Sequence, residues 1–189
     1  MDPAVSEANT TIMTRLIARQ AEVARSVGHR LASDITELRG DPEIIELLRA
    51  SVGGNVETIF HALRYDISLD NIEAPTAALE YARRLAQRGV PMNALTRAYR
   101  IGHAVALDAA TEEINGANMA PELSLAVLQR MTSVTFRYID WISQQVVAVY
   151  EDERDRWLAN RNSTRILRVR EVLSGNESDP EAVTDAIRY

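Results

Sequence analysis

The stretch that decides the fold is RGVPMNALTRAYRIGH, which runs from Arg88 to His103. Gly89 favours the left-handed conformation that commonly ends a helix, and Pro91 suits the first turn of the next helix because it needs no N–H partner there. The stretch therefore predicts one helix that ends at Gly89 and another that begins at Pro91 and runs to about Gly116. Because the loop is so short, the two helices should be antiparallel neighbours.

Helical periodicity continues through the rest of the chain, and no segment shows the sustained alternation that is typical of a β-strand. We expect one helix that begins near Ser6 or Asn9 and ends around Arg39–Gly40, a second that opens with Pro42, and a third that starts at Pro75. The pair Gly53-Gly54 interrupts the apolar pattern of the second helix, so a break or bend is expected there. The predicted fold class is all-α, a multi-helix bundle.

The C-terminal third carries the longest helical pattern. Residues 122–173 contain no proline or glycine after Pro121, and a continuous helix of that span would be about 80 Å long at roughly 1.5 Å per residue. Since this exceeds the diameter of a small domain, the second half must project from the bundle or break. The weak helix formers NRNST at 160–164 are the expected break point.

The same region suggests the domain organisation. We assign residues 1–159 to a helical sensory or regulatory domain, and residues 160–189 to a linker helix and the start of a junction. A short helix is expected in DPEAVTDAIRY (179–189), with Asp179 as its cap and Pro180 next. Because the chain stops directly after this amphipathic segment, we interpret it as a piece of a longer protein in which output domains follow.

Composition narrows the function classes. Hydrophobic residues make up 46% of the 189, which is typical of a globular chain, and the low aromatic content of 5% favours helices over strands. The net charge of −6 argues against this chain alone gripping a nucleic-acid backbone. The absence of cysteine excludes disulfides, zinc–thiolate sites and thiol nucleophiles. With no signal peptide and no apolar run of about 18 residues, we expect a cytoplasmic protein without a membrane partner.

No catalytic or cofactor motif emerges from the sequence. Nucleotide-binding loops, nucleophile elbows, zinc-protease signatures and EF-hands are all missing. The three histidines, His29, His61 and His103, are far apart in the chain, so we expect no metal, no cofactor and no enzymatic activity. His61 or His103 could face a pocket as a haem or metal ligand, but a partly buried histidine bonded to a neighbouring group is the favoured alternative.

The helix after Pro91 carries the candidate ligand site. Arg97 and Arg100 are three residues apart and share a helix face, where they could hold an anionic ligand. An ion pair to Glu80 or Asp108 is the favoured alternative. The predicted lining of a pocket, if this region forms one, is Arg97, Tyr99, Arg100, His103 and Phe60.

A candidate dimer contact lies in the long C-terminal helix. The spacing of coiled-coil core positions is found in Ile139, Ile142, Val146 and Val149. Polar residues follow in the same frame from Glu153 onward, so the pattern weakens beyond that point. We expect a homodimer formed through these four residues, and the charged tract after them is either a solvated helix or a signalling helix.

Two stretches of the chain carry a resemblance to a known family, namely RASVGGNVETIF (49–60) and ALEYARRLAQRGVPMNALTRAYRIGH (78–103). Both resemble N-terminal domains of the RsbRD type, which are named after RsbT co-antagonist proteins. The ending RVREVLSGNESDPEAVTDAIRY is similar to a junction in actinobacterial PucR/CdaR-type transcriptional regulators, where a GGDEF-like domain and a helix-turn-helix domain follow. The resemblance implies an all-α regulatory domain and DNA binding only through an absent C-terminal domain. It assigns no ligand and no functional residue. By analogy with RsbR-type stress regulators, the bundle could be globin-like.

These observations lead to one expected function and two alternatives. We expect a non-catalytic sensory and dimerisation domain of a cytoplasmic transcriptional regulator, which relays a signal through its long C-terminal helix. The first alternative is a domain that binds a small-molecule effector, either lipid-like or anionic. The second alternative is a stressosome-like scaffold that docks protein partners.

Overall fold

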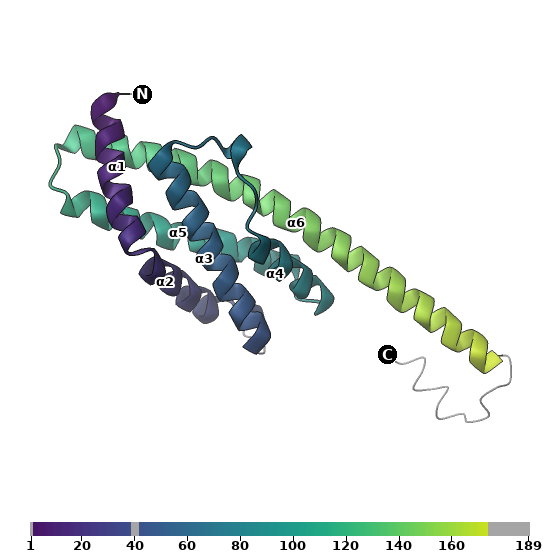
Figure 1. Cartoon of the computed structure of the whole chain (residues 1–189). Helices are drawn as coiled ribbons and strands as arrows, with labels where there is room; N and C mark the ends of the chain where they lie inside the picture. Colours follow the sequence, from purple (N-terminus) through teal and green to yellow (C-terminus); the bar gives the residue numbers. More distant parts are fainter. Residues whose placement is uncertain (1, 39–41, 174–189) are drawn as a thin grey trace.

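The structure is a computed structural model that describes residues 2–38 and 42–173. Within them the chain forms six α-helices: α1 (Pro3–Ala18), α2 (Gln20–Asp34), α3 (Pro42–Tyr65), α4 (Thr76–Gln87), α5 (Met92–Gly116) and α6 (Pro121–Leu173). Two short 3₁₀ turns, η1 (Thr36–Leu38) and η2 (Leu69–Asn71), lie between them. The described residues contain no strand, so the prediction of an all-α bundle with a long last helix is confirmed (Figure 1).

The turn around Gly89 is as predicted. α4 follows Pro75 directly, Gly89 has a φ of +66°, and α5 begins directly after Pro91. Glycine adopts this φ readily because it has no Cβ. The hydroxyl of Tyr150 on α6 donates a hydrogen bond of 2.6 Å to the carbonyl oxygen of Val90, so a third helix holds the turn between α4 and α5 in place.

The prediction of one unbroken helix over residues 6–39 is wrong. Arg19 leaves the helical region, with φ −106° and ψ 8°, and separates α1 from α2. Its guanidinium group pairs with Glu113 of α5 at 2.6 Å and with Glu22 of α2 at 2.8 Å. The bend is thus stabilised by a contact with a helix that lies far away in the sequence, and no proline or glycine marks it.

The predicted break at Gly53-Gly54 is also wrong, because α3 continues through both glycines. A Cβ atom on Gly54 would lie 3.0 Å from the Cβ of Pro75, whereas a Cβ on Gly53 would meet nothing within 4 Å. Real Cβ contacts are almost never closer than 3.0 Å. Gly54 therefore allows the start of α4 to approach α3 closely.

The core is formed by apolar side chains from all six helices. α6 packs along both α4 and α5, while α3 lies against α1, α2 and α4. Buried core residues include Ile12, Val27, Ile59, Tyr81, Leu95 and Ile142. The helices α5 and α6 run side by side in opposite directions, as their short connection requires (Figure 1).

The long helix α6 does not break at residues 160–164, so that prediction is wrong, while the prediction that its second half projects is confirmed (Figure 1). Tyr150, with 4% of its surface exposed, is buried near the point where α6 leaves the bundle. Just beyond it, the Nε2 of Gln87 donates a hydrogen bond of 2.7 Å to Glu153. We call residues 154–173 of α6 the projecting segment. The short helix expected at 179–189 lies outside the described residues.

Candidate functional site

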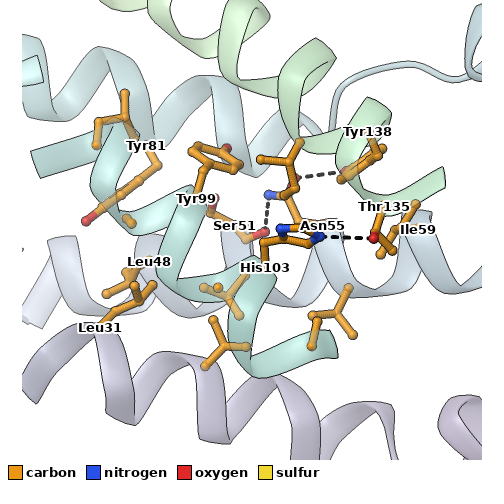
Figure 2. Close-up of a pocket in the computed structure, with 18 residues that line it drawn as sticks. Leu31, Leu48, Ser51, Asn55, Ile59, Tyr81, Tyr99, His103, Thr135 and Tyr138 are labelled. Carbon is orange, nitrogen blue, oxygen red and sulfur yellow. Dashed lines mark hydrogen bonds between the residues drawn. The ribbon is translucent and has the colours of Figure 1, made fainter. Parts of the chain in front are cut away.

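A cavity of about 80 Å³ lies inside the bundle between α3, α5 and α6, with further walls from α2 and α4 (Figure 2). Its apolar walls include Leu31, Leu48, Val56, Ile59, Leu95 and Ile139. Protein interiors contain few voids larger than a water molecule. Several lining residues, among them Tyr99, His103 and Ile139, keep partial exposure, so the cavity is partly open to solvent. A molecule that binds in the cavity only in the folded state would stabilise that state.

Two polar residues interrupt the apolar face of α3 at the cavity. Ser51 and Asn55 lie one turn apart, and the Nδ2 of Asn55 donates a hydrogen bond of 2.8 Å to the Ser51 carbonyl oxygen. The Oδ1 of Asn55 accepts a hydrogen bond of 2.9 Å from the hydroxyl of Tyr138 on α6. Sequence analysis missed these residues. The signal that could have found them is a polar pair at positions i and i+4 on an otherwise apolar helix face.

His103 of α5 faces Thr135 of α6, with its Nε2 3.0 Å from the threonine Oγ1 (Figure 2). The Thr135 hydroxyl donates its proton to the backbone carbonyl of Met131 at 2.8 Å, so it accepts from His103 and the Nε2 carries the ring proton. Burial lowers the pKa of His103, which favours the neutral ring. Since Nε2 is a donor here, the pair links α5 to α6 and does not activate the hydroxyl as a nucleophile.

Three tyrosines line the cavity, namely Tyr81, Tyr99 and Tyr138. Burial raises the pKa of Tyr99 to about 12, and hydrogen bonds with Asn55 and Ser51 oppose that rise. Burial also raises the pKa of Tyr81 and of Tyr138 above the usual value. All three hydroxyls are therefore neutral near pH 7.

Tyr81 differs from the other two tyrosines. Only 2% of its surface is exposed, and its buried hydroxyl has no hydrogen-bond partner among the residues that the structure describes. Figure 2 shows Tyr81 and Tyr99 at one end of the cavity, and the bonded pairs Asn55–Tyr138 and His103–Thr135 toward the other end. The unpaired Tyr81 hydroxyl thus lies away from the polar side chains that are hydrogen-bonded to one another.

The cavity lining carries no charge. Across residues 2–38 and 42–173, no lysine, arginine, aspartate or glutamate contributes to it. The predicted ligand residues Arg97 and Arg100 are exposed on α5 and lie outside the lining. Phe60 is buried elsewhere in the core. Of the five predicted residues, the structure therefore brings only Tyr99 and His103 to the cavity, where an anionic head group would meet no cation.

The four residues of the predicted dimer contact lie in the core of the bundle or pack against it. Ile142 and Val146 are fully buried at 0% exposure, and Ile139 and Val149 pack against the same core. The chain's own helices cover Ile142 and Val146 completely, while Ile139 and Val149 keep partial exposure, so a dimer contact through all four residues would require the bundle to open. Apolar spacing on a helix does not distinguish a partner within the chain from a second copy of it.

The described ranges lack two other kinds of site. Within residues 2–38 and 42–173, no three histidine, aspartate or glutamate side chains are grouped so that they could hold a metal ion. In the same ranges, no helix is both long and apolar enough to cross a membrane.

Comparison with protein families matches residues 21–165 to the RsbT co-antagonist protein rsbRD N-terminal domain. This match covers well over half of the chain and includes every residue that lines the cavity. No curated protein and no solved structure matches the chain. The resemblance seen in the stretch RGVPMNALTRAYRIGH is confirmed at the level of the family, and the chain belongs to the RsbRD N-terminal domain family.

Proposed function

We propose that this chain is a non-catalytic sensory domain of a cytoplasmic transcriptional regulator, in which α6 carries a change at the cavity to output domains. The observation that supports this is the double role of α6, which lines the cavity with Thr135, Tyr138 and Ile139 and also forms the projecting segment. The family is described as an N-terminal domain, which supports placing DNA binding in a later domain. The net charge of −6 is consistent with that placement.

A relay of this kind needs two arrangements of α6 relative to the other helices. In the arrangement seen, polar links hold α6 at two points of the cavity wall, through the pairs Asn55–Tyr138 and His103–Thr135. A molecule in the cavity that displaces one of these links, or pushes on Ile139, changes the balance between the two arrangements. Because the projecting segment continues the same helix, a small tilt at the cavity becomes a larger displacement at its far end.

Hydrogen–deuterium exchange on a filled cavity tests this relay without a ligand. Ala98 lines the cavity, whereas Ala104 is exposed on the same helix. We expect Ala98→Val to change the exchange rates of residues 150–173, and Ala104→Val to leave them as in the unsubstituted chain. A change confined to α3, α5 and the first half of α6 would contradict the relay.

A homodimer or protein-docking scaffold is the second candidate, and exposed apolar residues on α6 favour it. Leu125, Phe136 and Leu158 are 55%, 63% and 46% exposed. Phe136 follows Leu125 by eleven residues and Leu158 follows Phe136 by twenty-two. Because eleven residues span about three helical turns, the three side chains lie along one face of α6. Such a row suits a second copy of the chain, which carries the same row.

Light scattering over concentrations from about 1 to 100 µM tests the homodimer. We expect the unsubstituted chain to reach the mass of a dimer. A double variant with Leu125→Ser and Phe136→Ser should remain a monomer over the same range. A monomer mass for the unsubstituted chain at every concentration would contradict the homodimer.

A further inference from the structure

We infer that the cavity binds a small apolar molecule of the hydrocarbon type, which its walls recognise by shape and apolar contact alone, without a hydrogen bond or an ion pair. The inference rests on the proposed function and deepens it, because it names the chemical class of the signal at the same cavity.

The surface that faces the cavity carries the inference, because almost all of it is apolar. Aliphatic side chains from four helices supply this surface, among them Val27 of α2, Leu48 and Val56 of α3, Leu95 of α5 and Ile139 of α6. The transfer of an apolar molecule from water to such a surface is favourable in proportion to the apolar area that is buried. Close contacts between the ligand and the walls add dispersion energy.

The polar side chains among the lining residues are already engaged with one another. The Tyr138 hydroxyl donates a hydrogen bond of 2.9 Å to Asn55, and the Nε2 of His103 lies 3.0 Å from the Oγ1 of Thr135. The Tyr81 hydroxyl is enclosed by protein and cannot reach a ligand. A polar ligand would therefore lose its hydrogen bonds to water and find few replacements in the described walls.

The lining also excludes a charged ligand. Within residues 2–38 and 42–173, no arginine, aspartate or glutamate lines the cavity. An ion transferred from water into an apolar site without a partner of opposite charge is strongly disfavoured. The anionic alternative from the sequence thus loses its support, and the lipid-like alternative is reduced to a short uncharged molecule.

The size of the cavity limits the ligand further. An engineered apolar cavity of about 150 Å³ in another protein stays dry and binds benzene or xenon, and this one has a volume of about 80 Å³. The ligand should therefore contain roughly three to five non-hydrogen atoms. Water is a poor occupant, because a buried water usually needs two to four polar partners.

Gly102 keeps part of this space open. It lies in the interior of α5 and lines the cavity. A Cβ atom added to it would meet one atom within 4 Å, the Cγ1 of Val27 at 3.4 Å. Because glycine in the middle of a helix is less favourable than alanine, the open space is retained here although alanine would stabilise α5.

Methyl NMR spectra of the chain test the inference with 2-methylpropene, acetone and acetate, three probes that have nearly the same size and shape. We expect 2-methylpropene to shift the methyl signals of Val27, Leu48 and Leu95 saturably, with a dissociation constant in the millimolar range. Acetone should bind at least about tenfold more weakly, because its oxygen would lose its hydrogen bonds to water. Acetate should produce no saturable shift.

Three outcomes would overturn the inference. They are no saturable shift with 2-methylpropene, an acetone affinity within about tenfold of the hydrocarbon affinity, and saturable binding of acetate. The first would show that the cavity takes no ligand of this class, and the other two would show that its walls offer polar or charged partners.

Matched variants assign the binding to the cavity. Ala98→Val should weaken 2-methylpropene binding at least about tenfold by filling the space, and Ala104→Val on the exposed side of α5 should leave it unchanged. Gly102→Ala is a second filling variant, and it should also weaken binding. Its control is Gly53→Ala, since Gly53 lies outside the lining and its Cβ would meet nothing within 4 Å. Unaltered binding in both filling variants would overturn the inference.

These readouts keep the inference separate from the proposed function. Binding is read from methyl shifts at the cavity, and the relay is read from exchange in residues 150–173 of the filled variant. Binding of 2-methylpropene without any change in that exchange would support the ligand class and contradict the relay. Altered exchange in Ala98→Val together with no binding of 2-methylpropene would support the relay and overturn the ligand class.

Discussion

The Nε2 of His103 lies 3.0 Å from the Oγ1 of Thr135 and joins α5 to α6 in the wall of the cavity. The same hydroxyl donates back to the carbonyl of Met131, so the histidine is the donor in this pair. Protonation would add a charge to a ring that is partly buried and has no acidic partner in the cavity lining. Nε2 carries its proton in both states of the ring, so the hydrogen bond to Thr135 persists, and it is the burial of the ring that makes the stability of the bundle sensitive to pH.

We expect the free energy of unfolding to decrease as the pH is lowered, and part of this decrease should come from His103. Because burial lowers the pKa of this group in the folded state, the contribution of its neutral ring is fully present above the unfolded pKa of about 6.5. It is lost as the pH falls through that value toward the lowered folded pKa. Urea unfolding between about pH 7.5 and 5.5 should show a smaller pH dependence for His103→Ala than for the unsubstituted chain.

The His103→Ala variant should also be about 1 kcal/mol less stable at the upper end of this pH range, because it loses the hydrogen bond to Thr135. His29→Ala is the control, since His29 is exposed, and it should keep the pH dependence of the unsubstituted chain. If His103→Ala and the unsubstituted chain show the same pH dependence, the assigned role of His103 is incorrect.

Removing the Tyr138 hydroxyl should destabilise the bundle. Tyr138→Phe keeps the buried ring but leaves the Oδ1 of Asn55 without the donor that lies 2.9 Å away. We expect a loss of about 1–2 kcal/mol in the free energy of unfolding by urea. Tyr65→Phe is the matched control, because Tyr65 is 63% exposed and should change stability by less than about 0.5 kcal/mol. Equal effects of the two substitutions would count against a structural role for this hydrogen bond.

Substituting alanine for each of the two adjacent glycines in α3 should change the stability of the chain in opposite directions. Gly53→Ala places its Cβ where nothing lies within 4 Å, and should stabilise the helix by about 0.5–1 kcal/mol. Gly54→Ala places its Cβ 3.0 Å from the Cβ of Pro75, and should destabilise by about 1–3 kcal/mol as α4 is forced away. Thermal unfolding of both variants measures the difference, and a stabilising Gly54→Ala would disprove the close approach of α3 and α4.

Filling the cavity should stabilise the chain. Ala98→Val adds two methyl groups next to a void of about 80 Å³, and we expect its midpoint of thermal unfolding to rise by about 2–5 °C. Ala104→Val on the same helix adds no buried contact and should lower the midpoint slightly, because valine has a weaker helix propensity than alanine. A lower midpoint for Ala98→Val than for Ala104→Val would show that the space beside Ala98 is too small for the added groups.

Helix boundaries with a local cause could be predicted from the sequence, and those with a tertiary cause could not. Pro75, Gly89 and Pro91 act through their own backbone preferences, and the structure has the boundaries where these residues predict them. The bend at Arg19 coincides with a contact to Glu113 of α5, which no local pattern reveals. Gly53 and Gly54 suggested a break in α3, but the helix continues through both. The missing side chain of Gly54 instead lets Pro75, at the start of α4, lie close to α3.

The candidate site was only partly predictable for a similar reason. Tyr99 and His103 lie on the cavity side of a helix whose apolar stripe is visible in the sequence. Tyr81 and Thr135 reach the same cavity from α4 and α6, and only the packing of the helices brings them together. Likewise, Ile142 was assigned to a dimer contact because core and interface positions share the same apolar spacing.

The coupling between the cavity and the projecting segment is tested most directly by a distance measurement. The chain contains no cysteine, so Ala50→Cys on α3 and Leu158→Cys on the projecting segment, both exposed positions, provide two unique sites for spin labels. Pulsed electron resonance then reports the distribution of distances between them, in the labelled chain with its cavity open and with Ala98→Val filling it. The account predicts that Ala98→Val shifts this distribution and that Ala104→Val, on the exposed side of α5, leaves it unchanged. Superimposable distributions with and without Ala98→Val would contradict it.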